Sequence, residues 1–206
     1  MGKARSRRDL NLRRSLAYIA ARMMAEDGIA DYGTAKQKAA RQAGLSDAAL
    51  LPDNQEIEAA LREYQELYQK DEQPEHLRQL RESAVKVMRD FHDFRPALVG
   101  SVLNGTAGQF SDVNLQLFTD DPKALTIFLL NRRYRFEEGS KRVRLGERTE
   151  DVPRIQIEVE GVPVTLTVLD RDDERVGPAR GADEGPLRAK LAEVEALLTR
   201  AEGAGP

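Results

Sequence analysis

The spacing of apolar residues predicts that the first part of the chain is helical. Between Leu10 and about Ala43, apolar residues recur every three or four positions, which is typical of helices with one buried face. Glycines at positions 28, 33 and 44 interrupt this pattern. We therefore expect a first helix before these glycines and a second, short helix that Thr34 caps and Gly44 ends.

Two further helices are predicted before the pattern changes. Pro52 and Asp53 are start signals for a third helix within residues 51–70, which carries apolar residues on one face. A fourth helical pattern covers residues 73–94, and Pro96 stops it because proline cannot continue a helix. The first 95 residues are thus expected to form a helical region.

Strand-like alternation begins after Pro96. Short strands are expected at residues 97–101, 112–118, 134–138, 142–145, 154–160 and 162–170, with one helix at 121–133 that has Pro122 in its first turn. Glu160 and Gly161 between the last two strands predict a tight turn joining an antiparallel hairpin. Residues 171–185 are polar and rich in glycine, which is typical of a linker, and a final helix is expected at 185–202.

These patterns predict an α+β protein in three parts. A helical N-terminal region at 1–95 is expected to pack on a mixed or antiparallel sheet at 96–172. A charged linker and a C-terminal helix then occupy 173–206.

Composition narrows the chemistry that this chain can perform. It has 206 residues, no cysteine and two histidines, which excludes disulfides, thiol catalysis and thiolate zinc sites. Any metal would have to be a hard ion held by oxygen, which favours Mg²⁺ or Mn²⁺. Because no apolar run approaches the ~20 residues of a membrane span, no membrane partner is expected and we predict a soluble, cytoplasmic protein.

Charge is unevenly distributed along the chain. The formal net charge is -3, but residues 2–14 hold six basic residues and one acidic residue. This segment could be a basic arm that reaches a phosphate backbone, or simply a solvated and frayed end. A second basic group alternates with aromatic residues and could bind RNA; its members are Arg132, Arg133, Arg135, Arg142 and Arg144. A polar sheet face would explain this second group equally well.

The clearest chemical pattern joins a Gly-Ser pair to a strand that opens with an acid. Gly100 and Ser101 end the first predicted strand, and small residues there let backbone N–H groups approach phosphate oxygens. Asp112 and Asn114 are alternate residues of the next strand and should share one face. An alternative is that Asp112 is an ordinary turn residue and Asn114 part of an outward polar face.

This pattern resembles the DNA polymerase beta-like nucleotidyltransferase superfamily, in which a Gly-Ser turn precedes a strand carrying Asp-x-Asp or Asp-x-Glu. The resemblance covers about residues 97–170 and implies a nucleotidyltransferase-like sheet. It implies that Gly100 and Ser101 contact the triphosphate of ATP or another nucleoside triphosphate, and that Asp112 is catalytic and binds Mg²⁺ or Mn²⁺.

Asn114 departs from the family pattern. It stands where the family has a second carboxylate, so it could give a metal an oxygen ligand but no negative charge. The family also supplies a third carboxylate from a later strand, and Glu158 is our candidate for this catalytic role. Lys123, in the first turn of the predicted helix after the strand, is a further candidate for phosphate binding.

Three functions remain open from the sequence. The first is a nucleotidyltransferase that binds a nucleoside triphosphate with a divalent metal and transfers a nucleotidyl group to an unknown acceptor. The second is a catalytically inactive module of the same fold that binds RNA or a partner protein. The third is a helical interaction protein that binds a protein partner through its N-terminal helices and uses the sheet only as a scaffold.

Overall fold

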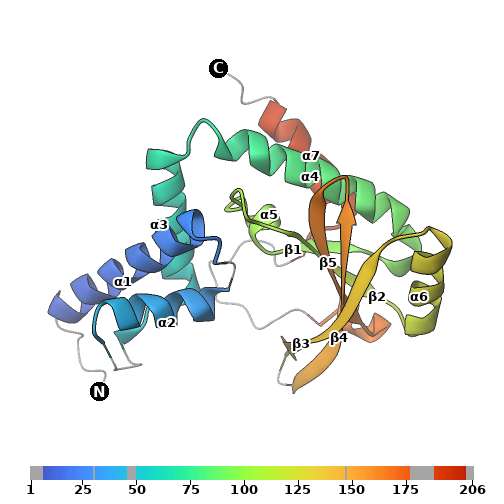
Figure 1. The fold of residues 1–206 in the computed structure, drawn as a ribbon, viewed down its shortest axis with the longest axis horizontal. Coiled ribbons are helices and arrows are strands. Elements are labelled where there is room, and N and C mark those ends of the chain that lie inside the picture. The colour runs from blue at the N-terminus through green and yellow to red at the C-terminus, as the bar shows by residue number, and fades with distance from the viewer. Residues whose placement is uncertain (1–6, 30, 46–49, 147, 177–187, 203–206) are drawn as a thin grey trace. The chain divides into compact units, whose positions relative to one another are not determined.

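The computed structural model describes residues 7–29, 31–45, 50–146, 148–176 and 188–202 (Figure 1). They form two compact units. The first contains the chain up to His76 together with Gly108–Ser111, and the second contains Leu77–Ala107 and the chain from Asp112 onward.

In the described part of the first unit, three complete helices pack around a core rich in small residues, and the unit also includes the first turn of α4 (Gln73–Asp90). The three complete helices are α1 (Arg7–Glu26), α2 (Tyr32–Gln42) and α3 (Asn54–Tyr68). Alanines make up much of the buried face, for example Ala17, Ala20 and Ala21 on α1, and they allow the helices to approach closely against Ile57 and Leu61.

Helix caps explain where α2 and α3 begin. The Asp31 side chain accepts a hydrogen bond from the Thr34 backbone N–H, so Asp31 is the N-cap of α2 and the prediction that Thr34 caps this helix is wrong. Asp31, three residues before Thr34, takes the capping position instead. Asp53 caps α3 as expected, and the Glu56 side chain accepts from the Asp53 N–H to complete a capping box.

The second unit contains a five-stranded mixed sheet, which confirms the predicted α+β class. In chain order its elements are α4 (Gln73–Asp90), η2 (His92–Phe94), β1 (Ala97–Val99), α5 (Ser101–Asn104), β2 (Val113–Phe118), α6 (Pro122–Asn131), β3 (Phe136–Leu145), β4 (Arg148–Val159), β5 (Val162–Leu169), η3 (Arg171–Glu174) and α7 (Leu191–Glu202). The strand order is β1-β2-β5-β4-β3. Only the β2–β5 pair is parallel.

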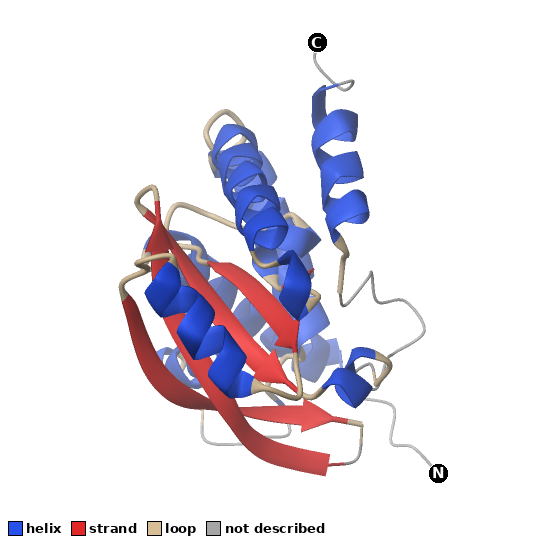
Figure 2. Cartoon of the chain, turned by 90° about the vertical axis from the view of Figure 1, so that its right-hand side faces the viewer, coloured by secondary structure: helices blue, strands red, loops and turns tan. Residues whose placement is uncertain are grey.

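Helices cover one face of this sheet. Val113, Leu115 and Leu117 of β2 point into the main core, together with residues of α4, α6 and α7. Figure 2 shows α6 in front of the sheet, running in about the same direction as the strands behind it. Helix α4 therefore packs with the sheet, because its apolar stripe forms part of this core. The alternate residues of β2 face the other side, which we call the open face.

The longest strands differ from the prediction. Residues 134–138 and 142–145 were expected to form two separate strands, but β3 runs unbroken because Gly139, Ser140 and Lys141 pair with an extended β4. Pro153 is tolerated inside β4 because the β4–β5 ladder starts at Arg154, so no partner on that side needs the missing N–H.

The β4–β5 turn confirms its prediction. Glu160 and Gly161 both have positive φ, at 53° and 81°, between the paired residues Val159 and Val162. Positive φ at both central residues is the geometry that matches the twist of a hairpin.

Part of the predicted linker lies within the described residues. Asp173 in η3 is buried and forms an ion pair with Arg148, whereas residues 177–187 lie outside the described residues. Helix α7 packs against the second unit, because its Val194 is part of the main core. Among the described helices, none has an apolar stretch long enough to cross a membrane.

Candidate functional site

The Gly-Ser turn lies beside the start of β2. In the β1–β2 ladder Val99 pairs with Asn114, so the chain leaves β1 next to the residues that precede β2. Gly100 has φ 77° and ψ -154°, a conformation open essentially to glycine alone, and a Cβ there would lie 3.9 Å from the Asn114 Cβ. The structure thus places Gly100, with Ser101 directly after it, beside Asn114 at the N-terminal end of β2, the end that Asp112 precedes.

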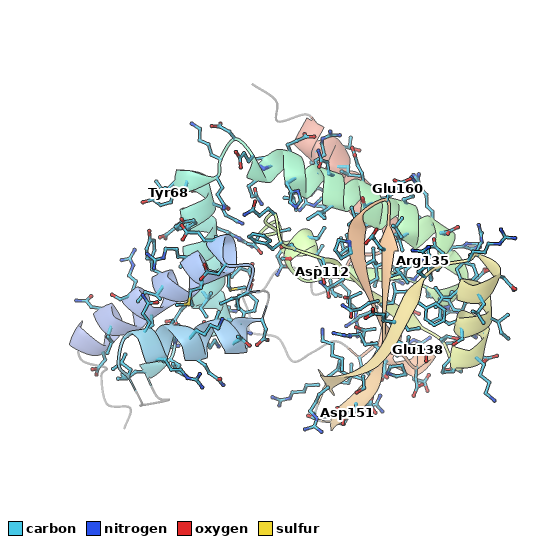
Figure 3. All side chains as sticks on the ribbon, in the orientation of Figure 1. Tyr68, Asp112, Arg135, Glu138, Asp151 and Glu160 are labelled. Atoms are coloured by element: carbon cyan, nitrogen blue, oxygen red, sulfur yellow. The ribbon has the colours of Figure 1, made fainter. Side chains whose placement is uncertain are left out.

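Asp112 is half-buried on the open face. Burial raises the pKa of its carboxyl group, while the positive charge of Arg154 and a hydrogen bond from the Thr165 hydroxyl act in the opposite direction. The carboxylate therefore faces a guanidinium and a hydroxyl group. Figure 3 labels Asp112 beside α5, the short helix that follows β1.

Strand register places polar residues in rows across the open face. Asn114 pairs with Thr165, which pairs with Gln156. The next row contains Gln116, Thr167 and Arg154. Paired residues share a face, so these two rows form one polar patch on β2, β5 and β4, in which Thr165 and Thr167 are buried. Beyond the patch, the same face carries a small apolar cluster of Ala97, Phe118, Leu145, Val152 and Leu169.

Asn114 is tied to its own strand. Its Nδ2 donates a hydrogen bond of 3.2 Å to the Asp112 backbone oxygen, which leaves the amide oxygen of Asn114 as the group able to meet a cation. Thr165, the partner of Asn114 on β5, is 6% exposed and provides a hydroxyl group where a further carboxylate would be needed for a second metal ion.

Glu158 is on the open face but is not adjacent to Asp112. It pairs with Pro163 of β5, so one whole strand separates it from β2, a spacing of about 10 Å between strand axes. Its side chain is exposed. Within the described part of the chain, no group of three or more histidine, cysteine, aspartate or glutamate side chains is placed to hold a metal ion.

Lys123 lies at the other end of β2. It is an exposed residue in the first turn of α6, which follows the C-terminal end of β2, whereas the Gly-Ser turn is at the N-terminal end. The six residues of β2 separate the two positions by about 17 Å. The structure therefore does not bring Lys123 to the Gly-Ser turn.

The five candidate RNA-binding arginines divide into two groups. Three are engaged within the protein: Arg132 pairs with Asp90 at 3.2 Å, Arg142 pairs with Asp151 at 3.0 Å, and the Arg144 Nε donates to the Gly146 oxygen at 3.3 Å. The other two, Arg133 and Arg135, line a groove of about 720 Å³ with Gln156 and Glu158.

Two residues of the site were not predicted from the sequence. Arg154 and Thr165 face Asp112, yet neither belongs to the Gly-Ser and Asp pattern. The alternation in residues 154–160 and 162–170 did place Arg154 with Glu158 and Thr165 with Thr167 on common faces. What it could not show is that β5 inserts between β2 and β4.

Comparison with known proteins adds no family assignment. No protein-family model matches the chain, and no curated protein matches it significantly.

The donor set restricts the metal chemistry that this face can support. Asp112 and the Asn114 amide offer two oxygen ligands, which fits a single Mg²⁺ ion held largely by the phosphates of a nucleotide. A two-metal centre does not fit, because the charged group that faces Asp112 is the cation Arg154.

Proposed function

We propose that this protein binds a nucleoside triphosphate on the open face of its sheet, in the manner of a nucleotidyltransferase, and that nucleotidyl transfer is weak or absent. The observation that carries this proposal is the position of the Gly100–Ser101 turn against Asn114, next to Asp112. It places a glycine backbone and the following serine beside the start of β2, the strand that Asp112 precedes directly.

The backbone at Gly100 supports the phosphate-binding part of the proposal. Gly100 has no side chain and a conformation that other residues avoid, so a phosphate can approach its backbone without meeting a Cβ; its carbonyl oxygen already accepts a hydrogen bond from the Asn104 N–H. Ser101 adds a hydroxyl donor directly after Gly100. Nucleotide phosphates need donors of this kind at close range.

The neighbours of Asp112 support the second part, weak or absent transfer. Arg154 already supplies positive charge beside the carboxylate, and a guanidinium can pair with phosphate without a metal. However, it cannot stabilise both the attacking and the leaving oxygen in the way two metal ions do. Asn114 and Thr165 provide no charge to recruit a second ion.

Calorimetric titration tests the proposal. ATP and GTP are titrated into the protein with and without Mg²⁺ or Mn²⁺, and then into Gly100→Ala, Asp112→Ala and Arg154→Gln. Asp93→Ala is the matched control, because Asp93 is a highly exposed aspartate of the same unit on η2. We expect the protein to bind at least one of the two nucleotides. Gly100→Ala and Arg154→Gln should lower this affinity, and Asp93→Ala should leave it unchanged.

The two metal conditions separate the roles of Asp112 and Arg154. Binding that needs Mg²⁺ and is lost in Asp112→Ala would mean that the ion links this carboxylate to the phosphates. Binding without metal that is lost in Arg154→Gln would assign the phosphates to the guanidinium. Absence of heat with either nucleotide, in protein whose circular dichroism shows an intact fold, would overturn the proposal.

A double substitution tests the reason given for weak transfer. In Asn114→Asp/Thr165→Asp, three carboxylates including Asp112 would lie on one face of two paired strands. We expect this variant to bind Mn²⁺ more tightly than the natural chain, as measured by electron paramagnetic resonance. If Mn²⁺ affinity does not change, the missing carboxylates do not explain a weak metal site.

A further inference from the structure

Helix α1 carries an aromatic residue between two arginines on one exposed stripe. Arg14, Tyr18 and Arg22 are spaced four residues apart, which puts them on the same side of the helix at intervals of about 6 Å. Arg14 and Tyr18 are exposed, and the Arg22 side chain is 45% exposed. The stripe belongs to the first unit and shares no residue with the proposed nucleotide site.

Tyr18 is part of a fixed cluster of tyrosines. Its ring meets the Tyr64 ring edge-on at a centroid distance of 6.0 Å, and the Tyr64 ring lies 4.7 Å from that of Tyr68. A hydrogen bond with Tyr68 raises the pKa of the Tyr18 hydroxyl, and the Tyr64 hydroxyl donates to Glu26. These contacts hold the rings in place before any ligand arrives.

Two of these rings remain available at the surface. Tyr18 is 39% exposed and Tyr68 on α3 is 64% exposed, although both are large aromatic residues. Figure 3 labels Tyr68, which lies at the C-terminal end of α3. Exposed aromatic rings held rigidly by neighbours are costly to leave in water and lose little entropy when a planar group stacks on them. We refer to Tyr18 and Tyr68 as the tyrosine platform.

A hollow along α1 adjoins the platform. It has a volume of about 450 Å³ and its lining residues are Asn11, Arg14, Ser15, Tyr18 and Ile19. Among the side chains that the structure describes, Arg14 has no ion-pair partner, whereas Arg13 beside it is paired with Asp53 and Glu56. The hollow therefore combines a free cation, an amide, a hydroxyl group and the edge of an aromatic surface.

We propose that this surface binds single-stranded nucleic acid, with a base stacked on the tyrosine platform and a phosphate paired with Arg14. Stacking on aromatic rings next to cations is how proteins hold unpaired bases without strong sequence preference. In the sequence, residues 2–14 hold six basic residues and one acidic residue, a composition that favours a polyanionic ligand. A duplex would hide its base faces from the platform.

Fluorescence anisotropy with a labelled oligouridylate of twelve nucleotides tests the proposal on the full chain. Tyr18→Leu removes the ring and should weaken binding by about 5- to 100-fold, the range for loss of one stacked base. Tyr18→Phe keeps the ring and should retain most of the affinity. Tyr68→Leu, at the more exposed ring, provides a second test in a variant less prone to misfold.

Salt dependence tests the phosphate contact. Arg14→Gln should lower the slope of log affinity against log salt by about 0.7, the value for one contact with a single strand. Arg41→Gln is the matched control, because Arg41 is an exposed arginine of α2 in the same unit. A control effect as large as that of Arg14→Gln would mean non-specific attraction and would overturn the assignment.

Tyrosine emission gives a direct readout of stacking. The chain has five tyrosines and no tryptophan, so tyrosine fluorescence can be observed without interference. Quenching by the oligonucleotide that is reduced in Tyr18→Leu and Tyr68→Leu supports the platform.

The proposal is overturned if the folded protein does not bind the oligonucleotide at low salt, if both leucine variants bind it normally, or if a hairpin duplex binds as tightly. ATP titration of Tyr18→Leu should match the natural chain, which keeps this outcome separate from the proposed nucleotide site.

Discussion

Replacement of Gly100 by alanine tests whether the Gly-Ser turn depends on backbone conformation. At φ 77° and ψ -154° an alanine pays a conformational cost of about 1–3 kcal/mol. Direct collision adds little, because the nearest heavy atom to the new Cβ is the Asn114 Cβ at 3.9 Å, an ordinary contact distance. We therefore expect Gly100→Ala to destabilise the second unit by about 1–3 kcal/mol.

Gly139→Ala is the matched control for this prediction. A Cβ at Gly139 would also lie 3.9 Å from its nearest atoms, Nε and Nη2 of Arg154, but the Gly139 φ angle is not positive and the residue is inside β3. Alanine costs less entropy than glycine inside a strand, so this substitution should be neutral or slightly stabilising. The pair of variants separates conformational strain from crowding.

Native-state amide hydrogen exchange on β2 is the appropriate assay. The chain contains two compact units, so a single denaturation transition need not report on the sheet. The opening free energy of amides such as that of Leu115 should fall by the expected amount in Gly100→Ala and not in Gly139→Ala. Equal effects in the two variants, or none in Gly100→Ala, would refute the strain argument.

Three further predictions concern single side chains. Carboxyl-carbon NMR should show a raised pKa for Asp112, and a further rise in Arg154→Gln, which removes a nearby positive charge. Because the pKa of Asp112 is higher in the folded than in the unfolded protein, where it is about 3.9, the folded state is favoured while the carboxyl group is protonated. This contribution to stability is complete below pH ~3.9 and is lost as the pH rises through the folded pKa. Tyr64→Phe removes the hydrogen bond to the half-exposed Glu26 and should cost about 1 kcal/mol in urea unfolding of the first unit, with no cost if that bond contributes nothing. Asp53→Ala removes an N-cap and should lower the stability of α3 by about 1 kcal/mol, seen as faster amide exchange in its first turn; unchanged exchange there would contradict the capping role.

The helices could be predicted because their signals are local. Spacing of apolar residues located α1, α3 and α4 within a few positions, and Pro96 marked the end of the fourth helical segment. The start of α2 was predicted wrongly because two nearby residues can both act as an N-cap. Asp31 and Thr34 can both cap a helix, and only the backbone geometry shows that Asp31 does.

The strands were harder to delimit because their partners are distant in sequence. Nothing local in Gly139, Ser140 and Lys141 indicates a strand, and they extend only because β4 pairs with them. The turn at Glu160 and Gly161 was predictable because a two-residue hairpin is defined by its own backbone.

The sequence by itself determined the α+β class and the absence of thiol chemistry, and it indicated Gly100, Ser101, Asp112 and Asn114 as a candidate site. These features follow from composition, local periodicity and a short connection between neighbouring strands. Only the tertiary structure decided what faces Asp112. Because β5 enters the sheet parallel to β2 and separates it from β4, Thr165 and Arg154 surround the carboxylate while Glu158 stays one strand too far. Strand order is a property of the whole chain, set by which apolar faces can be buried together, and no single motif encodes it.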